Sequence, residues 1–107
     1  MKKFVATSLV VMLAAAAQAA NAADPAELAK AKGCLNCHSV DAKIVGPAYK
    51  EVAQHYAKAD PKATENQLVK KVLNGTSGTY GPVAMPPNAG VSEAEARILV
   101  KWVLSLK

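Results

Sequence analysis

The chain has 107 residues, 51% of them hydrophobic, and its 13 basic residues outnumber its 8 acidic ones to give a formal net charge of +5. This length predicts one small domain. The basic residues are scattered and only one of them, Arg97, is an arginine, so the composition argues against nucleic-acid binding.

The first 23 residues predict a secretory signal peptide that is cleaved after residue 22 or 23. A basic start at 1–3 precedes an alanine-rich apolar run over 4–17, and Ala20-Asn21-Ala22 matches a cleavage site. The apolar run is shorter than the roughly 20 residues of a spanning helix, so stable membrane insertion is not expected. Cleavage would release a single periplasmic domain, residues 24–107, in which 11 basic residues face 8 acidic ones.

The first helix is predicted over 25–32. Asp24 has the character of an N-cap, Pro25 suits the first helical position, and Glu27 stands three residues after the cap. Gly33 should end this helix and present Cys34 directly after it.

The sequence Cys34-Leu35-Asn36-Cys37-His38 has the C-x-x-C-H spacing of covalent haem attachment. Two thiols three positions apart can add to the two vinyl groups on one edge of a porphyrin. The histidine that follows is then tethered beneath the iron and can bind it. No other cysteine is present. The motif therefore predicts one covalent haem c, held by Cys34 and Cys37, with His38 as an iron ligand.

Three more helices are predicted, and no segment alternates like a strand. The first, over 47–58, places Val52, Ala53 and Tyr56 on one side. The second begins at a capping box, Thr64-Glu65-Asn66-Gln67, and ends at Asn74-Gly75, while Asp60-Pro61 before it indicates a turn.

The last helix follows a capping box at Ser92-Glu93-Ala94-Glu95. Leu99, Trp102, Val103 and Leu106 then recur at helical spacing. The fold class is therefore all-α, with about four helices. Tyr49 and Trp102 are expected to supply aromatic packing, since residues 24–107 contain no phenylalanine.

Residues 74–90 break the helical pattern and predict a long structured loop, of the kind that usually carries function. Its helix breakers are Gly75, Gly78, Gly81, Pro82, Pro86, Pro87 and Gly90. Met85, the one methionine outside the predicted signal peptide, lies within this loop. In a chain with C-x-x-C-H, a thioether in a rigid loop is a candidate second iron ligand, and the alternative is a methionine that fills the core.

His55 is the other histidine and offers a bis-histidine alternative. It is predicted within a helix, without a breaker to bring it to the iron, and next to Tyr56, which shares a face with Val52. A surface position is therefore expected for His55.

Four separated motifs resemble the small bacterial class I cytochromes c, closest to the cytochrome c-551/c-552 type. They are Cys34-Leu35-Asn36-Cys37-His38, Val45-Gly46-Pro47-Ala48-Tyr49, the segment 81–88 around Met85, and the terminal 101–107. The resemblance covers the whole of 24–107. It implies a helical fold around one haem with His38 and Met85 as axial ligands. It also implies a non-enzymatic electron shuttle between a membrane cytochrome bc complex and an acceptor such as nitrite reductase or an oxidase, in respiration or denitrification.

The resemblance also implies roles for four surrounding residues. The Pro47 carbonyl would accept a hydrogen bond from the His38 ring, and the Asn88 amide would reach the Met85 sulfur. Tyr80 and Lys71 stand where a tryptophan and an arginine usually contact a haem propionate. A tyrosine can still donate one hydrogen bond, but a lysine offers only a point charge.

Partners are expected to be redox proteins that dock transiently with a monomer. Val45, Pro82 and Val83 are candidates for a small apolar docking patch near lysines. Other classes remain as alternatives: a peroxidase or gas sensor with an open iron site, a thiol-disulfide protein using Cys34 and Cys37, or a zinc site.

Overall fold

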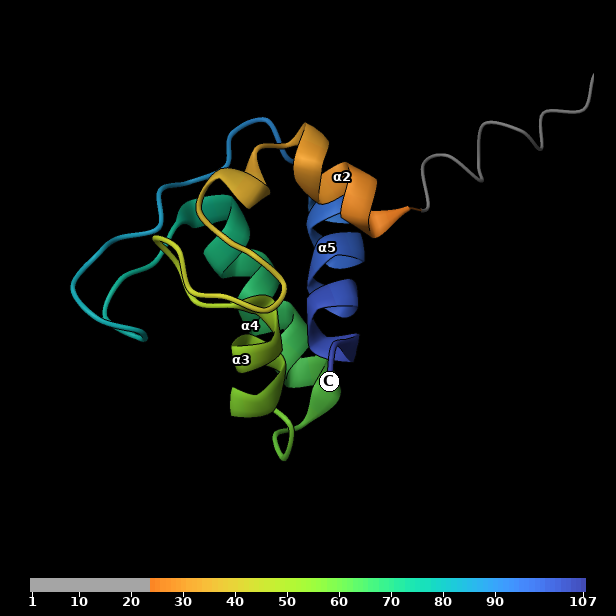
Figure 1. Cartoon of the computed structure of the whole chain (residues 1–107). Helices are drawn as coiled ribbons and strands as arrows, with labels where there is room; N and C mark the ends of the chain where they lie inside the picture. Colours follow the sequence, from red (N-terminus) through yellow and green to blue (C-terminus); the bar gives the residue numbers. More distant parts are fainter. Residues whose placement is uncertain (1–23) are drawn as a thin grey trace, which may run out of the picture.

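The structure is a computed structural model that describes residues 24–107 (Figure 1). The predicted signal peptide and its cleavage site lie outside the described residues. The described elements are helical: α2 (Pro25–Ala31), the 3₁₀ helix η1 (Cys34–Asn36), α3 (Tyr49–His55), α4 (Pro61–Asn74) and α5 (Glu93–Ser105). Over this range no helix is long and apolar enough to cross a membrane.

The first and last helices begin where local sequence signals predict. Asp24 caps α2 by accepting from the backbone amide of Ala26 at 3.1 Å. Ser92 and Glu95 form a reciprocal capping box on α5, with distances of 3.1 and 3.0 Å. Gly33, with φ of 78°, separates α2 from η1. Both predicted starts are therefore confirmed.

The predicted start of α4 is wrong by one helical turn. The helix begins at Pro61, and Asp60 is its cap because the Asp60 side chain accepts from the Ala63 amide at 2.8 Å. An N-cap followed by proline already fixes a helical start at this point. Thr64 consequently lies inside the helix, where it is buried. Asp60-Pro61 is a helix start and not merely a turn.

The predicted helix over 47–58 is too long. Helix α3 covers only Tyr49–His55, because Ala48 is extended, with φ of −59° and ψ of 142°, and its start has no side-chain cap. Pro47 lies outside the helix, and its carbonyl oxygen is used by His38 instead. This shortening gives the segment before α3 a role in the site.

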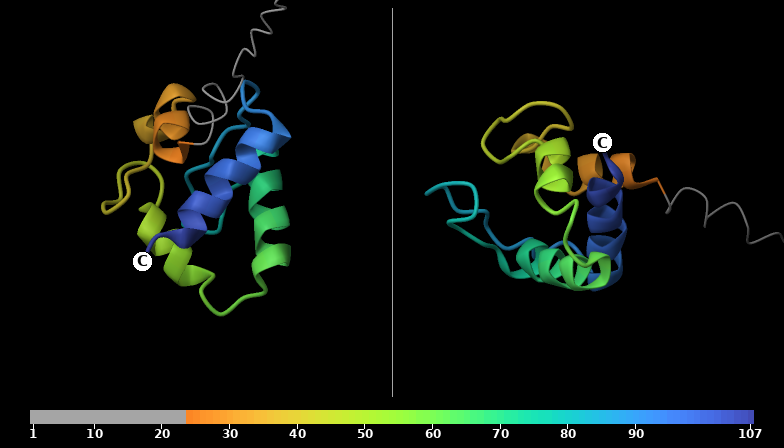
Figure 2. Two further views of the ribbon diagram at one scale, coloured as in Figure 1. Left: turned by 90° about the vertical axis from the view of Figure 1, so that its right-hand side faces the viewer. Right: turned by 90° about the horizontal axis from the view of Figure 1, so that it is seen from below.

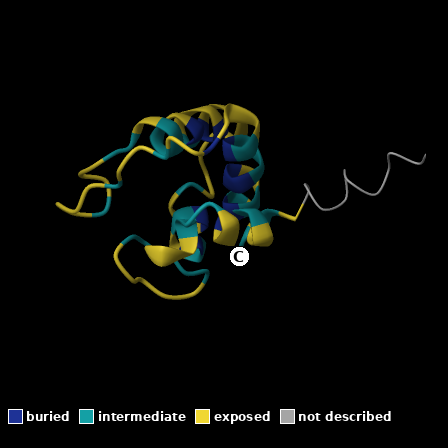
Figure 3. Cartoon of the chain, turned by 90° about the horizontal axis from the view of Figure 1, so that it is seen from above, coloured by how far each residue is buried: buried dark blue, intermediate teal, exposed yellow. Residues whose placement is uncertain are grey.

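Helix α5 is the centre of the packing, since it contacts α2, α3 and α4 (Figures 1 and 2). The buried core cluster consists of small and aliphatic side chains: Ala29, Val69, Val91, Ala96, Leu99 and Val100. Tyr49 packs edge-on against Trp102, with ring centroids 5.5 Å apart, as the expected aromatic packing requires. Figure 3 shows the buried residues gathered on the helices, while the long connections are largely exposed.

Two long connections lie beyond the same side of this helical core (Figure 2). One, 37–48, follows η1, and the other, 75–92, joins α4 to α5. Each holds a single antiparallel bridge, His38 with Lys43 and Thr76 with Met85. Each bridge therefore includes one of the two predicted iron ligands.

Candidate functional site

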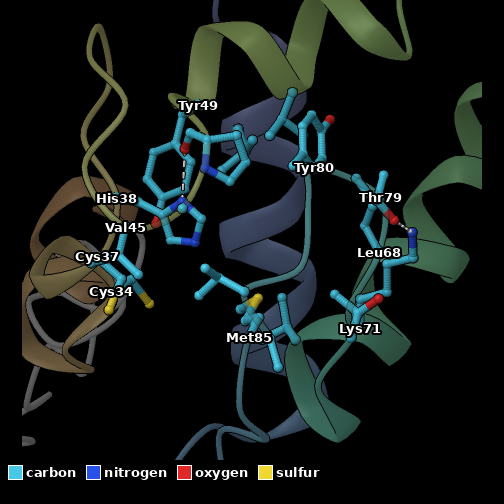
Figure 4. A pocket seen from close by; sticks show the side chains of 18 of the residues that line it. Cys34, Cys37, His38, Val45, Tyr49, Leu68, Lys71, Thr79, Tyr80 and Met85 are labelled. Carbon is cyan, nitrogen blue, oxygen red and sulfur yellow. Dashed lines mark hydrogen bonds between the residues drawn. The ribbon is translucent and has the colours of Figure 1, made fainter.

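A cavity of about 530 Å³ lies between the two connections and the helices. It is lined by residues from both connections and from α3, α4 and α5, and most of the lining is apolar. Cys34, Cys37, His38 and Met85 all contribute to its walls. The structure therefore brings the four residues of the predicted haem site to one cavity (Figure 4).

The His38 ring is held in a defined orientation. Its Nδ1 lies 2.8 Å from the carbonyl oxygen of Pro47. A carbonyl can only accept, so Nδ1 carries the hydrogen and Nε2 keeps its lone pair. Figure 4 shows Nε2 on the cavity side of the ring. The predicted Pro47 contact is thus present, and it prepares His38 to bind a metal through Nε2.

Two further residues, Tyr49 and Gly46, pack against the His38 ring. The Tyr49 ring is stacked on it, with centroids 4.9 Å apart and an angle of 22° between the planes. A Cβ at Gly46 would lie only 2.8 Å from Nδ1 of His38. Glycine is therefore required at 46 by close packing. The contact between Gly46 and His38 is not visible in the sequence pattern, although Gly46 is part of the motif before Pro47.

The two thiols are unpaired and close to His38 along the chain. The 3₁₀ turn places them there, with the Cys37 amide donating to the Cys34 carbonyl at 3.2 Å and the His38 amide donating to it at 3.1 Å. Cys34 is half-buried and Cys37 is exposed. Burial raises the pKa of the Cys34 thiol, which outweighs the lowering effect of its hydrogen bond with Tyr49. Both sulfurs remain accessible for covalent attachment at one cavity wall.

Met85 faces this wall from the other connection (Figure 4). Its backbone pairs with Thr76 through hydrogen bonds of 2.8 and 3.0 Å. Gly75 has φ of 79°, and a Cβ there would lie 2.6 Å from the Met85 carbonyl oxygen. The start of the loop therefore depends on glycine to let the chain pass close to Met85.

Asn88 ties the end of the loop to α4. Its side-chain amide donates to the carbonyl oxygen of Val72 at 2.9 Å, and its backbone amide donates to the same oxygen at 3.2 Å. A longer contact of 3.5 Å reaches the carbonyl oxygen of Pro86. The structure thus directs this amide to the backbone oxygens of Val72 and Pro86, whereas the resemblance directs it to the methionine sulfur.

Lys71 and Tyr80 lie on the cavity wall, as predicted for residues near the propionates. Lys71 donates to the Thr79 hydroxyl at 3.3 Å. The Tyr80 hydroxyl is buried and has no hydrogen-bond partner among residues 24–107. Burial raises the pKa of Tyr80 to about 12, so the phenol keeps its proton. A buried donor without an acceptor is costly, and a carboxylate oxygen of a bound group could accept its hydrogen bond.

The donor set fits an iron porphyrin. It combines two thiols, an imidazole nitrogen and a thioether with apolar walls and an unpartnered phenol. Within the described residues, no group of three or more histidine, cysteine or acidic side chains forms a metal site. His55 is exposed, as expected, and is not part of the cavity wall.

Comparison with known proteins identifies the family of the chain. Residues 22–107 match the family model described as Cytochrome c. The chain is 48% identical over 107 residues to cytochrome c-551 of Pseudomonas aeruginosa, which covers 100% of both chains. It is 48% identical over 82 residues to cytochrome c-552 of Nitrosomonas europaea, covering 77% of this chain and 78% of that protein. The crystal structure of wild-type Nitrosomonas europaea cytochrome c552 is similar, with a TM-score of 0.72 and 45% identity over 77% of this chain and 99% of that chain.

Proposed function

Because the chain belongs to the cytochrome c family, with its class I fold, single covalent haem c and role in electron transfer, we propose that it is a periplasmic one-electron carrier. In this proposal His38 and Met85 would bind the haem iron, through the ring nitrogen and the thioether that line the cavity. The observation that carries it is the placement of an oriented imidazole and a thioether in one apolar cavity, with both thiols beside the imidazole.

Each residue has a distinct task in this site. Cys34 and Cys37 hold the cofactor permanently, and Pro47 fixes the ring nitrogen that His38 presents. Met85 is a neutral, soft ligand that favours reduced iron. When bound, the haem supplies one iron that changes by a single electron.

The two ligands also argue against catalysis. If the His38 imidazole and the Met85 thioether both bind the iron, they would leave no open coordination site for a substrate or for oxygen. Close packing at Gly46 and Gly75 and the hydrogen bond from Asn88 hold the loops around His38 and Met85 in place. The ligand positions should therefore change little between redox states. This arrangement favours an electron carrier over an enzyme.

Docking would take place at the exposed tips of the two connections. Ile44, Val45, Pro82 and Val83 line the mouth of the cavity and lie at its outer rim, on the exposed connections. Exposed Lys43 lies next to Ile44 in the chain. A small apolar patch with a nearby charge suits transient contact with a donor and an acceptor. The proposed partners are a membrane cytochrome bc complex and a nitrite reductase or terminal oxidase, met by a monomer in respiration or denitrification.

The decisive experiment is an optical spectrum of the matured protein, oxidised and reduced, with carbon monoxide added last. Sharp reduced bands, a weak far-red sulfur-to-iron band when oxidised and no response to carbon monoxide are expected. A high-spin spectrum that shifts with carbon monoxide would remove Met85 as a ligand and favour a sensor or peroxidase. Met85→Leu is the matched variant, since it keeps the size but removes the sulfur, and it should lose the far-red band.

The docking proposal has its own test. Lys43→Glu should slow electron transfer to a redox partner and weaken its dependence on salt. Lys70→Glu, an exposed position outside the cavity wall, is the control. Equal rates for both variants would contradict docking at the loop tips.

A further inference from the structure

Tyr49 contacts both ends of the C-x-x-C-H motif. Its ring is stacked on that of His38, and its hydroxyl is hydrogen-bonded with the side chain of Cys34. Cys34 and His38 lie four positions apart, so one side chain from the start of α3 holds the first thiol and the imidazole at once. Figure 4 shows the three side chains on the same wall of the cavity.

Tyr49 is itself fixed by the rest of the fold. The residue is buried, with 7% of its surface exposed, and its ring packs edge-on against Trp102 of α5. Its backbone amide donates to the carbonyl oxygen of Ser39 at 2.9 Å. Because the ring and the backbone are both held, Tyr49 has little rotamer freedom left to lose when it orients a thiol.

The two thiols of the motif are held differently. The Cys34 side chain is half-buried and has the Tyr49 hydroxyl as a partner. Cys37 is exposed and is held through its backbone, since its carbonyl oxygen accepts from the Gly46 amide at 2.8 Å. The contact with Tyr49 therefore distinguishes the first thiol from the second.

The hydrogen bond leaves the Cys34 thiol able to react. A phenol is a good donor and a sulfur is a weak acceptor, so the Tyr49 hydroxyl donates and the sulfur keeps its own hydrogen. Covalent attachment needs that hydrogen, because the S–H group adds across a vinyl double bond. The sulfur binds the inner vinyl carbon and the hydrogen passes to the outer one, so nothing is released and no oxidant is required.

We infer that Tyr49 is a positioning residue for covalent haem attachment, which directs the Cys34 sulfur towards the vinyl group while its ring keeps the His38 imidazole in place. This inference rests on the proposed haem-carrying function. Cys37 does not depend on the hydroxyl. Loss of the hydroxyl should therefore impair the thioether at Cys34 selectively.

The test is Tyr49→Phe, which keeps the stacked ring and removes only the hydroxyl. The full chain is exported and matured with haem in a bacterial host, then unfolded, reduced and treated with iodoacetamide, which labels only cysteines that lack a thioether. Peptide mass spectrometry measures the labelled share of each cysteine. We expect the labelled share of Cys34 to rise about fivefold, the factor that corresponds to the loss of one hydrogen bond, while Cys37 stays attached.

Tyr56→Phe is the matched control. It removes a hydroxyl from the residue that ends the same helix and is not a partner of Cys34. Both labelled shares should stay at the wild-type level in this control. The optical spectrum gives a second readout, because an unreacted vinyl group extends the conjugation of the porphyrin. The reduced bands should therefore move to longer wavelength in Tyr49→Phe and not in Tyr56→Phe.

Two results would overturn the inference. A labelled share of Cys34 at the wild-type level in Tyr49→Phe would show that the hydroxyl does not guide attachment. Equal rises at Cys34 and Cys37, or loss of the folded protein, would assign Tyr49 a general role in stability. A wild-type chain that carries no haem, or that lacks the far-red sulfur-to-iron band, would instead contradict the proposed function, so the failures are distinguishable.

Discussion

The Nδ1 atom of His38 donates to the carbonyl oxygen of Pro47 at 2.8 Å. This one contact determines which ring nitrogen faces the cavity, and it requires the chain before α3 to stay extended. The same segment places Gly46 against the ring. The orientation of the His38 ring is therefore fixed by a backbone carbonyl, with the Tyr49 ring stacked on it.

Gly46→Ala should disturb the His38 ring. The added methyl would have to displace the ring or the segment, and overpacking of this kind costs about 1–3 kcal/mol. Denaturant titration of the haem-loaded protein measures the loss of unfolding free energy. Gly90→Ala is the control, since a Cβ there meets nothing within 4 Å. Equal stability of the two variants would contradict the packing argument.

Gly75→Ala should weaken the Met85 loop more than Gly78→Ala does. Both glycines have positive φ, 79° and 89°, so each alanine variant incurs about 1–2 kcal/mol of backbone strain. Only at Gly75 does the new Cβ also collide with the Met85 carbonyl oxygen. The far-red sulfur band and the denaturation midpoint should both decrease further in Gly75→Ala. A similar decrease in the two variants would leave backbone strain as the whole effect.

Asn88→Ala should loosen the end of the same loop. It removes the amide that donates to the Val72 carbonyl at 2.9 Å, and because the Asn88 backbone amide still donates to that carbonyl, the loss is that of one hydrogen bond, about 0.5–1.5 kcal/mol. We expect the far-red band to disappear at a lower denaturant concentration than in the wild type. Asn74→Ala, at an exposed position at the end of α4, should leave that concentration unchanged.

Glu65 should make the stability of the protein decrease in acid. This carboxylate is buried between α4 and α5, and Lys62 donates to it at 3.2 Å, while Lys101 and Arg97 lie at 3.6 and 3.7 Å. The hydrogen bond from Lys62, with the charges of Lys101 and Arg97, lowers the pKa of Glu65 below its ordinary value of 4.5.

A lowered pKa in the folded state has a definite sign. The stabilisation is fully present above the pKa of the unfolded state and is lost as the pH falls through the lower folded value. Glu65→Gln should therefore be less stable than the wild type at pH 7, and the difference should shrink below about pH 4.5. Urea titrations at several pH values measure it, with exposed Glu27→Gln as the control. A difference that is constant with pH would exclude a role for the Glu65 charge.

Helix starts were predictable where one local signal acts alone. Asp24 and Ser92 cap helices through bonds to residues two or three positions away, so the sequence contains all the information needed. At the start of α4, two candidate N-caps lie one turn apart, and the capping-box pattern wrongly favours Thr64 over Asp60. The end of α3 was also mispredicted, since apolar periodicity continues past the point where the helix stops.

The sequence alone predicts a haem site formed by Cys34, Cys37, His38 and Met85. The C-x-x-C-H motif is a local pattern, so its spacing can be recognised without knowing the fold. The Pro-rich loop predicts Met85 as a second ligand. The helical class is predicted from periodicity and is confirmed by the fold. How these groups are held depends on packing between distant segments. The Gly46 contact with His38, the Asn88 bond to Val72 and the approach of His55 to Tyr80 join segments whose meeting depends on how the two connections pack around the helices. Such contacts leave no periodic trace in a single sequence, because they arise from packing between segments and not from the repeat of any one helix.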